Sequence, residues 1–249
     1  MNGGAVGRGR DEELLLARIS AAAGRAHLGR RRATHRAPAG EPGARWAAAV
    51  AVARRLLRPG GGPVVGAGAR LDLYEHGMTV ATGKRIHAIR FDTTVVRRCR
   101  VLSPRGVTRA LVLVDVDDGR IVLRHGDFDR PREWWPGIRR AVTEAQVPRA
   151  LAALDRGARL VFGPVWITAD EVGSGRTALR WAQVQRVEVL NGSVAVRAAG
   201  RWQVWATAAS GIPNLCVLHA LAERLAGHAG ECLGEHLGER LARAERDDD

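Results

Sequence analysis

The chain of 249 residues is 46% hydrophobic, which is enough for one large domain or two small ones with a buried core. Its three cysteines argue against a disulfide framework and fit a reducing cytosol. The formal net charge of +13 favours an anionic partner, but 38 of the 39 basic residues are arginine, a bias that GC-rich coding also produces.

Most of the positive charge lies near the N-terminus. Residues 1–70 contain 13 arginines and four acidic residues, a surplus of +9, whereas the rest of the chain contributes only +4. A flexible basic tract attracts anionic headgroups by about 1 kcal/mol per basic residue near the membrane. The candidate contacts with an anionic surface are Arg25, Arg30, Arg31, Arg32 and Arg36. The alternative is a solvated tail without a binding role.

Residues 1–63 are predicted to form a basic leader with short helices and a linker. The apolar spacing after Asp11 predicts a helix to about Ala23. Residues 29–43 are basic and then rich in proline and glycine, which predicts an exposed linker. A second short helix is expected over residues 46–57. The N-terminus lacks the apolar core of a secretory signal.

The remainder of the chain carries a faint internal repeat. Residues 71–154 and 159–226 each begin with short β-rich runs and end with one amphipathic helix. We therefore divide this part into a first unit, residues 64–156, a second unit, residues 157–227, and a charged tail, residues 228–249. A strand bundle closed by a helix is a scaffold for binding and does not by itself indicate a reaction.

Turn residues mark the ends of the predicted strands and helices. Asp117 to Gly119 in the first unit and Asn191–Gly192 in the second are strong turn signals. Pro131 and Pro213 each open a closing helix, where a proline in the first turn is tolerated. Pro148 is expected to kink or restart the first of these helices.

The predicted fold class is α+β. Antiparallel strands that curl into an open barrel, closed at one end by a C-terminal helix, describe the pleckstrin-homology-like fold. The two units fit two tandem copies of this fold behind the short N-terminal helices.

Parts of the sequence also resemble a family of uncharacterised bacterial proteins from high-GC genomes, which carries only a domain-of-unknown-function label. The resemblance rests on LDLYEHGMTVATGKRIHAIRFD, FDRPREWWPGIRRAVTEAQVPRALAAL and GIPNLCVLHALAERL, and extends from about Ala17 to Ala226. It implies tandem pleckstrin-homology-like units and supplies no catalytic residue to transfer.

Members of that family often place membrane spans between the leader and the first unit. Here the corresponding stretch, residues 46–57, is short and contains Arg54 and Arg55. A bilayer span needs roughly 20 apolar residues. We therefore expect no membrane span in this chain.

The sequence offers little support for catalysis, a cofactor or a metal ion. His228, Cys232 and His236 are spaced by four residues, but no fourth zinc ligand is evident. Ser174 lies between two glycines and fits a turn better than a nucleophile. Cys99 lies among arginines that would lower its pKa, yet a packed thiol is the favoured interpretation. No cofactor and no metal are predicted.

Trp134 and Trp135 at the start of the first closing helix are candidate contacts with a partner. The favoured alternative is that one ring packs on the strands and the other covers the start of the helix.

Together these features predict a non-enzymatic interaction or scaffolding module in the cytoplasm that docks peripherally on a membrane or on an unidentified protein partner. An edge strand or inter-strand loop would present the site for a peptide or headgroup. One alternative is an enzyme or small-ligand binder that uses a cleft between the two units. Another is non-specific nucleic-acid binding through the leader. The leader lacks interleaved aromatic residues for base stacking, which disfavours specific recognition of a single strand.

Overall fold

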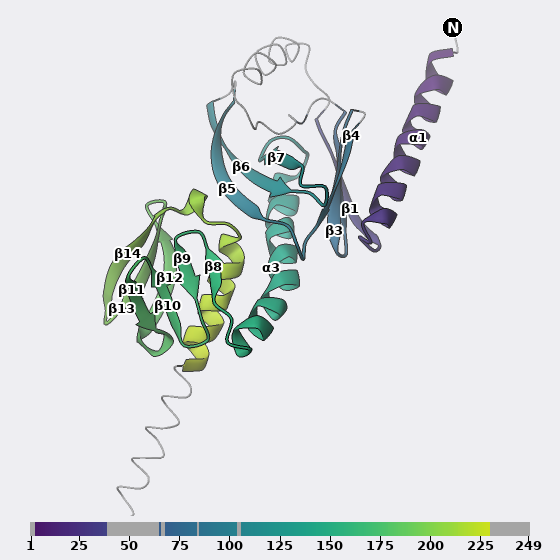
Figure 1. The fold of residues 1–249 in the computed structure, drawn as a ribbon. Coiled ribbons are helices and arrows are strands. Elements are labelled where there is room, and N and C mark those ends of the chain that lie inside the picture. The colour runs from purple at the N-terminus through teal and green to yellow at the C-terminus, as the bar shows by residue number, and fades with distance from the viewer. Residues whose placement is uncertain (1–2, 39–64, 66–67, 84, 104–105, 230–249) are drawn as a thin grey trace, which may run out of the picture. The chain divides into compact units, whose positions relative to one another are not determined.

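The computed structural model describes residues 3–38, 65, 68–83, 85–103 and 106–229 (Figure 1). The protein is α+β with several antiparallel sheets, and none of the sheets in the described residues closes into a barrel. Clustering of contacts divides the chain into two compact units, residues 1–145 and residues 146–249. Each unit is described separately below.

The first unit contains two antiparallel sheets and two helices. The helices are α1 (Gly3–Arg25) and α3 (Pro131–Asp155), and the boundary between the two units falls within α3, after Ala145. The first sheet has the strand order β1 (Arg31–Arg36), β2 (Arg70–Tyr74), β3 (Gly77–Thr82), β4 (Arg85–Arg90). The second has the order β5 (Val96–Ser103), β6 (Gly106–Val114), β7 (Arg120–Arg124).

The helix α1 is longer than the predicted helix over residues 11–23, and it packs by one stripe. Ile19, Ala22 and Ala23 recur at helical spacing and are buried. The helix ends at Arg25, and the guanidinium of Arg90 donates a hydrogen bond to the carbonyl of Ala26 at 3.3 Å. This bond satisfies a carbonyl that the end of the helix leaves without a partner.

The strand β1 corrects the prediction of an exposed linker over residues 29–43. Residues 31–36 pair antiparallel with β2, with His35 opposite Leu71 and Arg36 opposite Arg70. The alternation buries His35, which is 2% exposed, and leaves Arg36 in solvent. The sequence did not indicate this strand, because it is rich in arginine and only one of its residues, His35, is fully buried. Part of the predicted leader is thus an edge strand of the first unit.

Buried apolar residues of both sheets form the core of the first unit. Those with no exposed surface are Leu71, Met78, Val80, Ile89, Ala110, Leu111, Leu113, Ile121 and Leu123. The sheets are also tied together at an edge, where Nδ1 of His87 on β4 lies 2.7 Å from the Asp115 carboxylate after β6. The predicted turn at Asp117 to Gly119 is confirmed, with Asp118 at a φ of 58°.

The helix α3 begins at Pro131 as predicted and continues as one helix through Pro148. Of the two outcomes expected at this proline, the restart is therefore wrong, and the kink stays a prediction. Pro148 is exposed. A proline removes one backbone donor from the helix, and packing of the opposite face maintains the helix across it. That face is buried at Ile138, Val142 and Val147.

The second unit repeats this order of elements. Its first sheet consists of β8 (Leu160–Phe162), β9 (Val165–Ile167), β10 (Glu171–Ser174) and β11 (Thr177–Arg180). Its second sheet consists of β12 (Val184–Leu190), β13 (Ser193–Ala198) and β14 (Arg201–Ala208). A helix over residues 215–229 follows. The predicted Asn191–Gly192 hairpin is confirmed, with φ angles of 49° and 80°.

One close contact explains a glycine in the second unit. A Cβ added to Gly173 would lie 2.1 Å from Cζ2 of Trp166, on the neighbouring strand β9. The same indole ring lies 3.9 Å from the Arg159 guanidinium, a cation–π contact. Gly173 therefore makes room for the Trp166 ring on the sheet.

None of the helices in the described part of the chain is both long and apolar enough to cross a bilayer.

Candidate anionic-surface docking site

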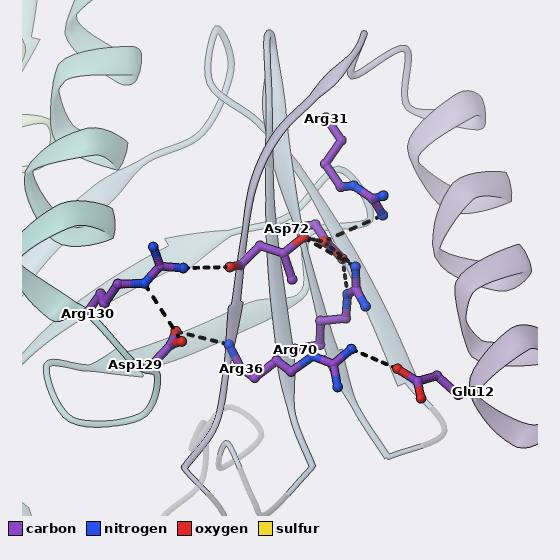
Figure 2. A network of polar contacts seen from close by, with 8 residues as sticks. Glu12, Arg31, Arg36, Arg70, Asp72, Asp129 and Arg130 are labelled. Atoms are coloured by element: carbon purple, nitrogen blue, oxygen red, sulfur yellow. Dashed lines mark hydrogen bonds and ion pairs between the residues drawn. The ribbon is translucent and has the colours of Figure 1, made fainter. Parts of the chain in front are cut away.

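The predicted arginine cluster lies beside a polar network formed by α1, β1, β2 and the segment after β7 (Figure 2). Nη2 of Arg36 lies 2.7 Å from Oε1 of Glu12 on α1. Arg31 is more distant, with Nη1 3.9 Å from Oδ1 of Asp72. These two arginines therefore have carboxylates of their own chain as neighbours.

The centre of this network is Asp72, whose side chain has no exposed surface. Nε and Nη2 of Arg70 donate to its two oxygens at 2.7 and 2.9 Å, and the Thr34 hydroxyl also donates to it. The hydrogen bond to Asp72 raises the pKa of Arg70 above its ordinary value. A buried carboxylate with a full set of donors stabilises the joining of β1 to β2.

Asp129 ties the segment between β7 and α3 to the end of β1. Its carboxylate accepts the Arg36 backbone N–H at 3.1 Å, and its own N–H donates to the Arg36 carbonyl at 2.9 Å. Nδ1 of the buried His35 lies 3.4 Å from the same carboxylate. These contacts hold the C-terminal end of β1, so Asp129 helps to anchor the strand.

All five predicted arginines are exposed. Besides the two described above, Arg32 lies 4.0 Å from Glu75. Arg25 and Arg30 form no ion pair with another described residue. Because three of the five have a nearby carboxylate, this cluster offers less net positive charge than its sequence indicates.

The two predicted tryptophans, Trp134 and Trp135, differ in burial. Trp134 is fully buried and meets the Phe128 ring edge-on at 5.9 Å, so it cannot contact a partner, which corrects that half of the prediction. Trp135 is partly exposed and lies edge-on to Trp134 at 5.6 Å and to His125 at 5.5 Å. Trp134 is therefore part of the core, and only Trp135 remains a candidate contact with a partner.

A second group of arginines, on the three-stranded sheet of the first unit, is not indicated as a surface by the sequence alone. The strands β5, β6 and β7 contain six arginines and no acidic residue. Five of these arginines are exposed and the last is partly buried: Arg97, Arg98, Arg100, Arg109, Arg120 and Arg124.

Strand pairing brings three of these side chains onto one face. Arg100 lies directly opposite Arg109, and Arg98 lies opposite Leu111. Since side chains alternate along a strand, these arginines lie on the side of the hairpin that carries Val107, which is 67% exposed, and Leu111, which is buried in the core. We call Arg98, Arg100, Arg109 and Val107 the arginine face.

The corresponding sheet of the second unit has a mixed charge. Its arginines include Arg186, whose Nε lies 2.8 Å from the Glu188 carboxylate. The strands β12, β13 and β14 also contain Arg197 and Arg201, and Glu188 is their one acidic residue. The strands of this sheet thus contain three arginines and one acidic residue, whereas those of the first unit's sheet contain six arginines and no acidic residue.

Burial, rather than the neighbouring arginines, controls the pKa of Cys99. It raises the pKa of the thiol, with a smaller lowering effect from Arg120. A raised pKa reduces the thiolate fraction, which agrees with the predicted packed thiol. Burial also raises the pKa of Asp127 to about 6, against the lowering effect of a hydrogen bond from the Arg124 backbone.

A hollow of about 530 Å³ in the second unit is lined by residues 168–171, Arg180 and Trp181, among others. Its polar groups hold the loop in place, because Nε1 of Trp181 donates to the Thr168 carbonyl at 3.0 Å and the Glu171 N–H donates to the Thr168 hydroxyl at 3.1 Å. Both signs of charge line it, so it does not attract one charge strongly.

Across the described residues, no group of three His, Cys, Asp or Glu side chains is placed to hold a metal ion. Cys232 and His236 of the trio considered above lie outside those residues.

Fold and surface together define an α+β protein of two units, each with a four-stranded sheet, a three-stranded sheet and a following helix. The chain belongs to a family of unknown function, DUF6585, which matches residues 66–229. The match includes β2 and the elements after it, and begins after α1 and β1. No curated protein and no solved structure matches the chain. The predicted membership of a domain-of-unknown-function family is thereby confirmed.

Proposed function

We propose that the protein is a non-enzymatic interaction module of two pleckstrin-homology-like units, and that its first unit docks on an anionic membrane surface through the arginine face. The order of elements supports the first part of this proposal. Four strands, three strands and a helix follow one another in both units, as the pleckstrin-homology-like fold requires.

The arginine face is the observation that carries the proposal. Like charges directly opposite each other on a sheet are destabilising, and Arg100 lies opposite Arg109. A phosphate group between two guanidinium groups removes this repulsion and accepts hydrogen bonds from both. The exposed Val107 beside them suits the apolar boundary beneath the headgroups.

The expected affinity of the arginine face for an anionic membrane is moderate. Each basic residue close to an anionic membrane contributes about 1 kcal/mol. The three arginines of the face therefore supply weak, reversible binding that the second unit or a partner protein can strengthen. Such binding decreases with salt because the Debye length falls from about 10 Å at 0.1 M to 3 Å at 1 M.

Vesicle co-sedimentation tests this proposal. The full chain is expected to bind phosphatidylcholine vesicles that contain phosphatidylserine, and not vesicles of phosphatidylcholine alone. The double variant Arg100→Glu, Arg109→Glu is expected to bind roughly 30-fold more weakly, since two contributions of about 1 kcal/mol are lost.

Two matched variants complete the test. Arg197→Glu with Arg201→Glu makes the same change of charge on a hairpin of the second unit and should leave vesicle binding nearly unchanged. Arg25→Glu with Arg30→Glu tests the leader. If the leader variant loses binding and the Arg100, Arg109 variant keeps it, the docking surface is the leader and the proposal for the arginine face is wrong.

A further inference from the structure

The strand β14 is an edge strand of the three-stranded sheet in the second unit, and the carbonyl of Trp205, just after Val204, accepts the Ser174 hydroxyl of β10 at 2.9 Å. It is the last strand in the order β12-β13-β14. All four residues from Arg201 to Val204 are exposed, with Trp202 at 38% and Val204 at 68%. Exposed apolar residues on an edge strand form a template for pairing with another chain.

The hairpin register shows which backbone groups face outward. Ala199 and Gly200 have φ angles of 48° and 74°, typical of a two-residue type I′ turn. Such a turn is closed by a hydrogen-bonded pair, here Ala198 with Arg201. Hydrogen-bonded and non-hydrogen-bonded pairs then alternate along the ladder.

The alternation places Gln203 in a bonded pair with Val196, and leaves Trp202 and Val204 in the non-bonded pairs. The N–H and C=O groups of Trp202 and Val204 consequently point away from β13. Two donors and two acceptors at two-residue spacing match the pattern that an added strand needs.

The side chains indicate what kind of strand fits. Trp202 and Val204 share one face of β14, whereas Arg201 and Gln203 share the other. The one acidic residue in the strands of this sheet, Glu188, lies beside Arg186 at 2.8 Å. A partner strand would therefore present apolar side chains toward Trp202 and Val204, and carboxylates toward Arg201.

We propose that β14 binds an extended peptide of alternating apolar and acidic residues by strand addition. This inference rests on the proposed role as an interaction module and assigns its protein-binding edge to the second unit. Membrane docking and peptide binding would then use different units and can fail separately.

A short fluorescent peptide of alternating valine and glutamate serves as the probe, and fluorescence anisotropy of the full chain measures its binding. The same peptide with lysine in place of glutamate is the charge control, and we expect it to bind weakly. Arg201→Glu should reverse this preference, because it places a carboxylate where the guanidinium was.

Two variants test the edge itself. Val204→Pro removes an N–H that the sheet does not use, and should weaken binding of the valine–glutamate peptide by roughly tenfold or more through the lost hydrogen bond and the blocked edge. Val204→Lys keeps the backbone donor and should weaken binding by disrupting the apolar face. Val161→Lys alters a similarly exposed valine on β8, 65% exposed, and should have no effect.

Hydrogen exchange provides a signature that side-chain binding alone would not produce. The amides of Trp202 and Val204 should exchange quickly in the free protein and become protected with the peptide bound, while the Gln203 amide is protected in both. Unchanged exchange at Trp202 and Val204 would overturn the proposal. So would equal binding of both peptides, or loss of binding in Val161→Lys alone. A concentration-dependent dimer that disappears in Val204→Pro would show instead that β14 pairs with a second copy of the chain.

Discussion

Three carboxylates of the first unit are partly or fully withdrawn from water and meet three different sets of partners. Asp72 accepts hydrogen bonds from the Arg70 guanidinium and the Thr34 hydroxyl. Asp115 lies against His87 and also accepts the backbone N–H of Asp117. Asp127 accepts the Arg124 backbone N–H at 2.7 Å, and burial has the largest effect on its pKa. Burial raises the pKa of Asp127 to about 6.

Because of this raised pKa, the ionised form of Asp127 destabilises the folded protein at neutral pH. Because its folded-state pKa of about 6 exceeds the ordinary 3.8, the folded protein binds the proton more tightly, and stability from this group is lost as pH rises from about 4 to 6. Asp127→Asn should therefore raise the free energy of unfolding by about 1 to 3 kcal/mol at pH 7.5.

The gain should vanish below pH 4, where the aspartate is protonated in both states. Denaturant unfolding of both proteins over this pH range provides the measurement. A gain that is the same at pH 4 and pH 7.5 would show that burial of charge is not its cause. Asp72→Asn is the opposite control, because it leaves the buried Arg70 with a weaker acceptor and should destabilise the protein at neutral pH.

At the scale of elements, β1 is a segment that is rich in arginine and also forms a strand of a sheet. Its alternation places Thr34 on the face that meets Asp72, and His35 on the buried side. The turn after β7 clamps the strand through Asp129. Arginine content in this segment is therefore compatible with a strand whose buried positions are few.

Deleting residues 1–63, the predicted leader, should damage the first unit rather than merely remove charge. The deletion takes away α1 and β1, uncovers β2, and removes the Thr34 donor to Asp72. We expect a loss of more than about 3 kcal/mol in the stability of the first unit, measured by hydrogen exchange of β2.

The variant Arg25→Gln, Arg30→Gln is the control for this deletion, since it removes leader charge and keeps both elements. It should leave exchange of β2 unchanged. Unaltered exchange in the deletion itself would mean that β1 contributes nothing to the first unit.

For the whole molecule, the division into two compact units predicts two separable responses to substitution. Gly173→Ala places a methyl group against the Trp166 ring and should destabilise the second unit by about 1 to 3 kcal/mol. Hydrogen exchange measured by mass spectrometry should show faster exchange in β8 to β14 and no change in β1 to β7. Equal acceleration in both sets of strands would show that the units unfold as one cooperative body.

The surface charge also belongs to this scale. The +9 surplus of residues 1–70 indicates a basic leader, yet Glu12, Asp72 and Glu75 lie close to three of its arginines. The strands β5 and β6 contain four arginines and no acidic residue. The charge counted along the chain therefore did not indicate this second group of arginines.

Several features were predictable because a few neighbouring residues encode them. The hairpin at Asn191–Gly192, the helix opening at Pro131 and the packed thiol at Cys99 follow from local turn chemistry, proline geometry and the ordinary burial of cysteine. The burial of Trp134 was only one of two alternatives, since adjacent tryptophans on a helix point in different directions and the packing decides which one enters the core.

By itself, the sequence determined the α+β class, the repeated order of strands and helix, and the family. These depend on hydrophobic periodicity and turn residues within short stretches. Only the tertiary structure decided that residues 31–36 complete a sheet, that Arg100 faces Arg109, and that Trp202 and Val204 turn their backbone groups outward. Each of these depends on strand pairing and register, which are settled by contacts between strands and by burial of a common core rather than by any one strand's own residues.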